Sequence, residues 1–270
     1  MNRIDTAFAR LRSENRQGLI PFVTAGDPSL SATRDIVIEL ARIGATVIEL
    51  GIPFSDPMAD GPVIQRASER ALCLDFGIAE VLDLVAEVRQ VSEVPIVLFS
   101  YYNPVLQYGL RRLCAEGKTA GIDGVLITDL SPEESEELAR NLAEHNLSLI
   151  FLVAPTSTDL RLKLVAERAS GFIYAVSRAG VTGEQHQVSQ EAEKLVRRLR
   201  KFTQLPIAVG FGISNAQQVS QVWDFADAAV VGSALVAEIE RHAEDPELVK
   251  HTGAFASALL PSLEERADRF

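Results

Sequence analysis

The chain has 270 residues, of which 47 % are hydrophobic and 23 % charged, which is the composition of a soluble globular protein with a sizeable core. Its formal net charge of −11 argues against nonspecific binding to nucleic acid or to an anionic membrane, because both need a basic face. The two cysteines, Cys73 and Cys114, belong to no CxxC pattern, which disfavours a disulfide scaffold and a cysteine metal site.

The start of the chain predicts a short amphipathic helix, because Ile4, Phe8 and Leu11 fall at helical spacing. This stretch contains acids and no apolar segment of the kind found in signal peptides. The longest strongly apolar run of the chain, LSLIFLVAP, is too short to span a bilayer. We therefore expect a cytoplasmic protein that does not bind a membrane.

Eight short apolar runs follow in the chain, and each predicts a strand. The runs are almost continuously apolar rather than alternating, which is typical of parallel strands that are buried on both faces. The stretches between them have helical spacing. The eight runs are LIPFVT (19–24), TVIELG (46–51), PIVLFSY (95–101), DGVLIT (123–128), LSLIFLV (147–153), GFIYAV (171–176), PIAVG (206–210) and DAAVVG (227–232).

The intervening stretches carry helix start and stop signals. Ser131, Pro132 and Glu134 have the residue types of an N-cap, a first-turn proline and a capping-box acid, so a helix is predicted to begin there. Eight strand–helix units without a linker predict one domain over residues 1–270. Its expected fold is a (β/α)8 TIM barrel with an extra N-terminal helix, and a doubly wound open sheet is the alternative.

Two of the predicted loops are longer than the others, at 52–80 after the second strand and at 177–190 after the sixth. Both follow the carboxyl ends of strands, which is where the active sites of such barrels lie. The extended loops therefore belong to the face that is expected to carry function.

Glu49 lies near the end of the second predicted strand and has the same parity as Val47, so it is expected to face the barrel interior. A carboxylate there is costly unless it is paired or protonated with a raised pKa. We interpret Glu49 as a general acid/base at the barrel mouth. A core glutamate that is hydrogen-bonded to a neighbour is the alternative.

Asp56 and Asp60 lie on the loop that follows, IPFSDPMADGP, which three prolines stiffen. A stiff loop over a barrel mouth suits a positioned catalytic acid, although aspartates before proline or glycine commonly cap turns. By spacing alone the two interpretations of Asp60 are evenly balanced, and the turn interpretation is favoured for Asp56.

Glycine-rich segments end the last two strands, at GFGIS (210–214) and GSALV (232–236), and RAGVTG (178–183) lies at the same rim. Together they predict a phosphate site, because glycine lets backbone N–H groups at helix starts approach phosphate oxygens. Ser214 and Ser233 either donate hydroxyl groups to this site or cap helices. No HExxH, GxSxG or Walker motif occurs and the four histidines show no ligand spacing, so no metal site is predicted.

In combination these motifs resemble the tryptophan synthase α-subunit family. The match runs over nearly the whole chain in the order and at the spacing of the family, and its most specific part is ELGIPFSDPMADGPVIQRA (49–67). Further matching segments are PFVTAGDP (21–28), SYYNP (100–104), SRAGVTG (177–183), GFGIS (210–214) and GSALV (232–236). The resemblance implies a (β/α)8 barrel that cleaves indole-3-glycerol phosphate to indole and glyceraldehyde 3-phosphate by a retro-aldol step.

The resemblance also implies roles for single residues. Glu49 and Asp60 match the two catalytic acids of the family. The positions that match substrate contacts are Phe22, Tyr102, Tyr174, Thr182 and Phe211 around the indole and glycerol portions, and Gly183, Gly212, Gly232 and Ser233 around the phosphate. Asp56, Pro57 and Asn103 match positions at the interface with the partner subunit.

The partner implied by the resemblance is a pyridoxal-phosphate β subunit, which receives indole for L-tryptophan synthesis within an α2β2 tetramer. No cofactor is expected in this chain itself. Three alternatives stay open: a free-standing indole-releasing lyase, a non-catalytic activator of a β subunit, and another phosphate-binding barrel enzyme such as an isomerase or decarboxylase. The last is disfavoured because no predicted strand carries an interior lysine.

Overall fold

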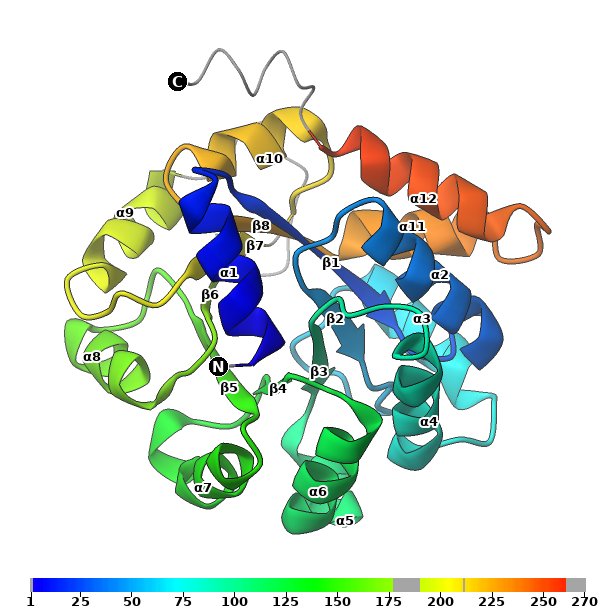
Figure 1. Ribbon diagram of the computed structural model, residues 1–270, viewed down its shortest axis with the longest axis horizontal. Helices are drawn as coiled ribbons and strands as arrows, with labels where there is room; N and C mark the ends of the chain where they lie inside the picture. The colour runs from blue at the N-terminus through cyan, green and yellow to red at the C-terminus, as the bar shows by residue number, and fades with distance from the viewer. Residues whose placement is uncertain (1, 177–189, 211, 261–270) are drawn as a thin grey trace.

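The structure, a computed structural model, describes residues 2–176, 190–210 and 212–260 (Figure 1). Its eight strands are all parallel to their neighbours and close into a barrel in chain order, which confirms the (β/α)8 prediction over the open sheet. The strands are β1 (Gly18–Thr24), β2 (Ile48–Gly51), β3 (Ile96–Ser100), β4 (Gly124–Ile127), β5 (Ser148–Val153), β6 (Ile173–Val176), β7 (Ile207–Gly210) and β8 (Ala228–Val231).

Helices surround the strands in Figure 1, with α1 lying across the opening that faces the viewer. The helices are α1 (Arg3–Ser13), α2 (Leu30–Arg42), α3 (Pro62–Leu72), α4 (Ile78–Val88), α5 (Tyr102–Tyr108), α6 (Leu110–Ala120), the 3-10 turn η1 (Pro132–Glu134), α7 (Glu136–Glu144), α8 (Asp159–Arg168), α9 (Gln190–Leu199), α10 (Ala216–Trp223), α11 (Ser233–Arg241) and α12 (Leu248–Ala258). The long loop after β2 thus contains α3, a helix outside the strand–helix alternation.

Side chains that alternate along the strands form two cores. The smaller core fills the barrel and takes residues from every strand or its start, such as Val47 and Val97. Ile4 and Phe8 of α1 join it, so the N-terminal helix closes the floor of the barrel. The larger core lies between the strands and the outer helices. Burial on both faces is the reason why the strands lack an alternating pattern.

The helix predicted from Ser131 onward is divided in the structure. The Ser131 side chain accepts no backbone N–H, and its hydroxyl instead donates to the Glu134 carboxylate at 2.7 Å. The buried Ser135 hydroxyl donates to Pro132 O at 2.8 Å, which holds the chain in the 3-10 turn η1. The α-helix α7 therefore begins only at Glu136, and the capping-box prediction was wrong there.

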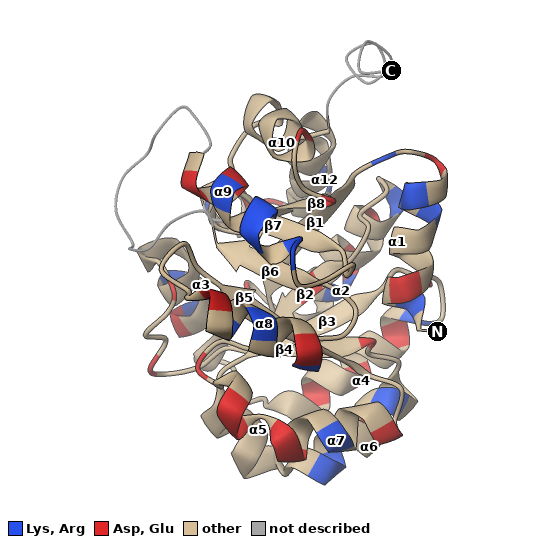
Figure 2. Cartoon of the chain, turned by 90° about the vertical axis from the view of Figure 1, so that its left-hand side faces the viewer, with Lys and Arg blue, Asp and Glu red and all other residues tan. Residues whose placement is uncertain are grey.

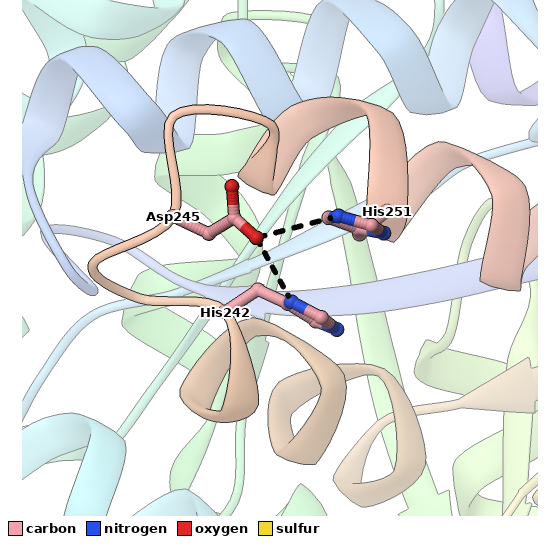
Figure 3. Close-up of side chains that lie close together, drawn as sticks. All are labelled: His242, Asp245 and His251. Carbon is pink, nitrogen blue, oxygen red and sulfur yellow. Dashed lines mark ion pairs between the residues drawn. The ribbon is translucent and has the colours of Figure 1, made fainter.

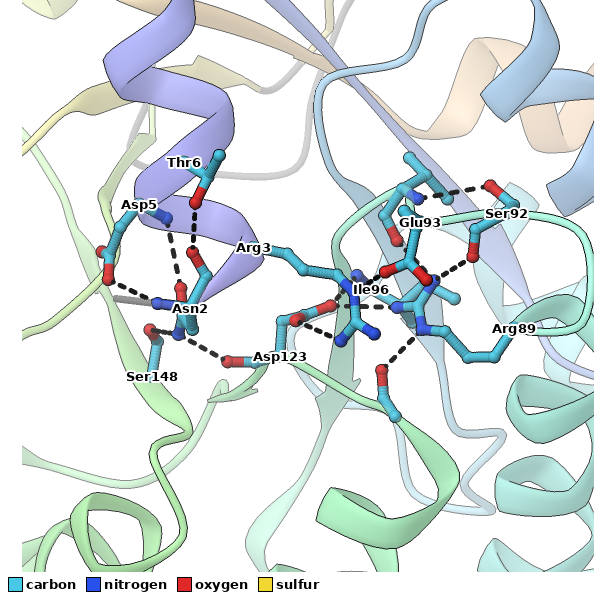
Figure 4. A network of polar contacts seen from close by, with 12 residues as sticks. Asn2, Arg3, Asp5, Thr6, Arg89, Ser92, Glu93, Ile96, Asp123 and Ser148 are labelled. Carbon is cyan, nitrogen blue, oxygen red and sulfur yellow. Dashed lines mark hydrogen bonds and ion pairs between the residues drawn. The ribbon is translucent and has the colours of Figure 1, made fainter.

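A buried carboxylate ties α1 to the floor of the barrel (Figure 4). Asp123, just before β4, accepts from the Arg89 guanidinium at 2.9 Å, from Arg3 at 3.2 Å and from the Ile96 N–H at 2.9 Å. Arg89 also donates to three backbone carbonyls, so both buried charges are well supplied with partners. The α1 helix is thereby held by a charged network as well as by Ile4.

Replacing Asp123 with alanine is expected to lower the free energy of unfolding by about 3 kcal/mol, because it leaves the Arg89 charge buried without its carboxylate. Urea unfolding at pH 7 measures this effect. The matched control is Glu93→Ala, since Glu93 pairs with Arg3 on the surface and is expected to contribute less than about 1 kcal/mol. If both variants lost the same free energy of unfolding, the larger contribution proposed for Asp123 would be contradicted.

Acidic and basic residues alternate over the outer helices α7, α8 and α9 on the side that Figure 2 shows. This side of the molecule therefore carries charges of both signs. Within the described ranges, every helix is too short or too polar to cross a lipid bilayer.

Candidate active site

Glu49 stands in β2, where its Cα pairs with those of Phe22 in β1 and Val97 in β3. The residue is 1 % exposed, and burial raises the pKa of its carboxyl to about 8. The side chain is therefore protonated at neutral pH, which makes it a proton donor. The strand parity that places Val47 in the barrel interior places Glu49 at the mouth, two residues further along the chain.

Glu49 Oε1 has no hydrogen-bond partner within the described part of the chain, although it is buried. Thr24 Oγ1, at the carboxyl end of β1, is also buried without a hydrogen-bond partner among the described residues. Buried polar atoms are nearly always hydrogen-bonded, so unpaired ones near the ends of adjacent strands need an explanation. A polar ligand that enters the barrel mouth would supply the missing partners.

Asp60 lies on the loop that leads from β2 into α3, and backbone contacts fix its position. Its N–H donates to Pro57 O at 3.1 Å, and its carbonyl accepts from Gln65 Nε2 of α3 at 2.9 Å. Burial raises the pKa of the Asp60 carboxyl to about 6, and a hydrogen bond from the Tyr101 hydroxyl acts in the opposite direction. Asp60 is therefore mostly ionised at neutral pH, while Glu49 is protonated.

A narrow cavity of about 10 Å³, which holds roughly one water molecule, opens beside Asp60. Its walls combine aromatic and aliphatic side chains with a few polar groups, which is the usual composition of a small-molecule site. The lining residues are Phe22, Thr24, Gly51, Ile52, Asp60, Ile64, Ser68, Phe99, Ser100 and Tyr101. Phe22 and Phe99 meet edge to face with ring centroids 5.2 Å apart, so they form one aromatic wall.

Two glycines make room for the aromatic side chains of the site. A Cβ on Gly51 would lie 2.5 Å from Cζ of Phe22, and a Cβ on Gly210 would lie 2.2 Å from Oη of Tyr174. A larger residue at either place would force the ring on the neighbouring strand to move, because these rings lie directly over the glycine backbone. Tyr174 is buried in the barrel core, where burial and the nearby Glu49 charge raise the pKa of its hydroxyl.

The glycine-rich ends of β7 and β8 lie at the same rim. Gly212 follows β7 with a φ of +79°, which favours glycine, and Gly232 is the N-cap of α11. The amides of Leu235 and Val236 donate to Gly232 O. The first two amides of α11, those of Ser233 and Ala234, have no acceptor earlier in their own helix and can bind an anion. Gly232 also lies beside Phe22, so this helix start borders the aromatic wall.

The structure brings Glu49, Asp60, Phe22, Tyr174 and the start of α11 to the carboxyl end of the barrel. It does not bring Tyr102 there, because that side chain packs against the core between strands and helices and its N–H donates to Asp129. The preceding residue, Tyr101, lines the cavity where Tyr102 was expected. Thr182, Gly183 and Phe211 lie outside the described residues, as does most of the loop 177–190.

Tyr101 is the site residue that sequence reasoning missed. It is buried, its hydroxyl accepts the Ala59 N–H at 2.8 Å, and it hydrogen-bonds the Asp60 carboxylate. The SYYNP motif pointed to this place but offered two adjacent tyrosines. Only the turn from β3 into α5, with Tyr101 as an extended N-cap residue, decides which of them faces the cavity.

Replacing Tyr101 with phenylalanine is expected to raise the pKa of Asp60, because the hydrogen bond that favours its ionised form is lost. If Asp60 acts as an anion, the acidic limb of the pH–rate profile moves to higher pH and the rate at pH 6 falls about 10-fold. Tyr102→Phe is the matched control and should leave that limb in place. If the acidic limb did not move in the Tyr101 variant, the Tyr101 hydroxyl would not be lowering the pKa of Asp60.

A second surface lies outside the barrel mouth, over the loop after β2 and the adjoining helix α3. A groove of about 410 Å³ is lined there by Phe54, Ser55, Asp56, Pro57, Met58, Gln65, Glu69 and Leu72. Met58 is 84 % exposed, which is unusual for a large apolar side chain, and Asp56 is also exposed. Asn103, the third residue predicted at an interface, is exposed on α5 after the next strand.

Comparisons with known proteins agree with this architecture. The profile of the family described as "Tryptophan synthase alpha chain" matches residues 8–259. A tryptophan synthase alpha chain from Solibacter usitatus is 48 % identical over 267 residues, which cover 99 % of this chain and 100 % of that protein. The crystal structure of tryptophan synthase subunit alpha from Legionella pneumophila superposes with a TM-score of 0.89 at 36 % identity, covering both chains completely.

A solved structure of a complex is also similar. It is the tryptophan synthase α2β2 complex from the hyperthermophile Pyrococcus furiosus. The matching chain in that structure has a TM-score of 0.84 and 39 % identity, over 90 % of the present chain and 97 % of its own length.

Proposed function

The chain belongs to the tryptophan synthase alpha chain family, and on that premise we propose which of its residues perform the reaction. It is a carbon–carbon lyase that cleaves indole-3-glycerol phosphate to indole and glyceraldehyde 3-phosphate. It acts as the alpha subunit beside a beta subunit that uses the indole for L-tryptophan. We further propose that residues 1–270 form one domain and that the protein works in the cytoplasm.

The observation that carries the assignment of Glu49 is its buried carboxyl at the barrel mouth, whose Oε1 has no hydrogen-bond partner among the described residues and whose pKa burial raises to about 8. Indole C3 is a poor carbanion leaving group, because the ring gains little from holding that charge. Protonation of C3 turns the ring into an indoleninium, which can accept the electrons of the C3–C3′ bond. Glu49 is the proton donor for this step, since burial keeps it protonated at neutral pH.

Asp60 is the anion that stabilises the indoleninium. Positive charge grows at the ring N1–H as C3 takes its proton, and an ionised carboxylate beside N1 lowers the energy of that state. The Glu49 carboxylate formed in the first step then removes the proton of the C3′ hydroxyl. The C3–C3′ bond breaks, its electrons return to the ring, and the C3′ hydroxyl becomes the aldehyde of glyceraldehyde 3-phosphate.

The remaining site residues hold the substrate for these steps. Phe22, with the aromatic wall that it forms, contacts the indole ring in this assignment, and Tyr174 lies deeper beside Glu49. The start of α11 at Gly232 and Ser233, together with Gly212, binds the phosphate. Anchoring the phosphate turns binding energy at the remote end into orientation at C3. Thr182, Gly183 and Phe211 keep the substrate-binding roles that the family resemblance implies.

The groove beside Met58 is the surface that we assign to the partner beta subunit. It adjoins the loop that carries Asp60, so docking there acts on the position of a catalytic group. Asp56, Pro57 and Asn103 border the same side of the barrel in this assignment. The assembly is an α2β2 tetramer as in the Pyrococcus furiosus complex. We assign pyridoxal phosphate to the beta subunit, as the family resemblance implies.

Replacing Met58 with glutamate is expected to weaken binding of the beta subunit about 10-fold or more, because it places a charge in an apolar part of the groove. Isothermal titration calorimetry measures the affinity. The control is Val91→Glu, which introduces the same charge at an exposed apolar residue after α4, at the opposite end of the barrel. A similar loss of affinity in both variants would contradict the docking assignment.

The reaction itself is tested by indole release from indole-3-glycerol phosphate. The purified chain is assayed alone and with a beta subunit, and indole is quantified by chromatography. We expect slow release alone and faster release in the complex. Fast release that the beta subunit does not change would indicate a free-standing lyase. No indole under either condition would overturn the assignment of the site.

A further inference from the structure

We propose that His242, Asp245 and His251 form a zinc-binding site between α11 and α12, far from the groups that cleave the substrate. The three residues lie at the end of α11, in the loop after it and in the first half of α12 (Figure 3). The phosphate-binding start of α11 is at the other end of the same nine-residue helix. The proposal does not depend on the assigned reaction.

The separations of the candidate ligand atoms fit a bound ion. Asp245 Oδ2 lies 3.6 Å from His242 Nδ1 and 3.4 Å from His251 Nε2. Each of the three residues offers one ligand atom such that all three lie within 4.8 Å of one another. These contacts are longer than ordinary N–H···O hydrogen bonds, which measure about 2.7–3.2 Å. Ligands about 2.1 Å from a tetrahedral zinc ion are about 3.4 Å apart, so the cluster has the spacing of a metal site.

Surrounding groups orient two of the three ligands. Asp245 Oδ1 accepts the Glu247 N–H at 2.8 Å, which leaves Oδ2 directed at both imidazoles. Glu238 Oε1 lies 3.2 Å from His242 Nε2, on the side of the ring away from Asp245. Metal-binding histidines usually donate their second N–H to a carboxylate in this way, which fixes the tautomer with a free lone pair on the other nitrogen.

The two rings are stacked, with centroids 4.1 Å apart and an interplanar angle of 13°. The lone pairs of the ring nitrogens therefore point in parallel planes and do not converge on one point. For both rings to bind the same ion, one of them has to turn. His251 is the ring that turns, because its side chain is 42 % exposed whereas that of His242 is 22 % exposed and held by Glu238. Rotation about the terminal torsion of histidine is soft, so this adjustment costs little.

Two imidazole nitrogens and one carboxylate oxygen form a ligand set that suits zinc, with water in the fourth position. The sequence pattern concealed the set, because the ligands are separated by two and five residues rather than by the three residues of an HExxH motif. A bound ion would join the end of α11 to α12, and the expected consequence is a more stable C-terminal helix rather than a change in chemistry.

The test uses the full-length chain without a histidine tag, treated with a chelator and dialysed. Titration with Zn²⁺ is followed by calorimetry and thermal unfolding, and Co²⁺ supplies a visible absorption spectrum that reports the ligand geometry. We expect one Zn²⁺ per chain, a rise in Tm of about 5 °C at saturation, and the absorption bands of tetrahedral Co²⁺.

Two ligand variants and one control decide the outcome. His251→Gln and Asp245→Asn should each weaken Zn²⁺ binding at least about 10-fold and remove the rise in Tm. His145→Gln, at a histidine on the end of α7 whose Nδ1 contacts Asn141 O, should leave both unchanged. The proposal is overturned if the wild-type chain binds no Zn²⁺, or if the ligand variants bind it as tightly as the control.

Discussion

The Glu49→Gln variant is expected to lose at least about 1,000-fold in kcat for indole release, because glutamine can neither donate the proton to C3 nor accept the one from the C3′ hydroxyl. The amide has nearly the shape of the protonated carboxyl that the buried site holds at neutral pH. Substrate should therefore still bind, with KM changed only a few-fold. Single-turnover assays with the beta subunit present measure the chemical step.

The same variant is expected to be more stable than the wild-type chain at high pH. Burial raises the Glu49 pKa from 4.5 to about 8, so between these values the folded state keeps a proton that the unfolded state has released. The stability of the wild-type chain therefore falls as pH rises through this window, by roughly 5 kcal/mol in total. Glutamine does not titrate and avoids this loss.

Urea unfolding at pH 5, 7 and 9 checks the linkage. The two proteins should be about equally stable at pH 5, and the advantage of Glu49→Gln should grow up to pH 9. Parallel curves at all three values would mean that Glu49 has an ordinary pKa in the folded chain. A loss of activity without this pH dependence would leave Glu49 in the reaction but remove the explanation of how it stays protonated.

The position of Glu49 was predictable from sequence, since the rule involved is local. Side chains alternate along a strand, so a residue two places after Val47 shares its side, and a parallel strand is buried on both faces. The barrel followed from eight such strands with helical stretches between them. Both inferences use only spacing along the chain, which is why they agree with the closed barrel of the structure.

Other features depend on contacts between distant segments, and spacing does not encode them. Which of Tyr101 and Tyr102 reaches the cavity depends on the turn from β3 into α5 and on the position of the Asp60 loop. The Asp123 network joins residues about 120 positions apart in the chain. The division of the helix at Ser135 depends on a buried hydroxyl bond that competes with the predicted cap.

The histidine cluster is another feature that spacing along the chain does not predict. No metal site was predicted at His242 or His251, because the histidines of the sequence show no ligand spacing. The two residues meet only because the loop after α11 folds back and lets α12 pack against α11 and α2. Tertiary packing, rather than a local motif, therefore defines this candidate site.

The pH–rate profile of kcat/KM is expected to be bell-shaped, with limbs near pH 6 and pH 8. On the acid side, activity rises as Asp60 ionises, since burial places its pKa at about 6. On the alkaline side, activity falls as Glu49 loses its proton near pH 8. Because kcat/KM reports the groups of the free enzyme, these values refer to the protein without substrate.

Replacing Asp60 with asparagine should lower kcat/KM at pH 7 by about 100-fold or more, because a neutral amide cannot stabilise the charge that grows at indole N1. The acidic limb should disappear while the alkaline limb of Glu49 stays near pH 8. Asp56→Asn is the matched control on the same loop and should retain both limbs. If the acidic limb persists without Asp60, another group titrates there. The proposal that Glu49 acts in its protonated form and Asp60 in its ionised form would then be contradicted.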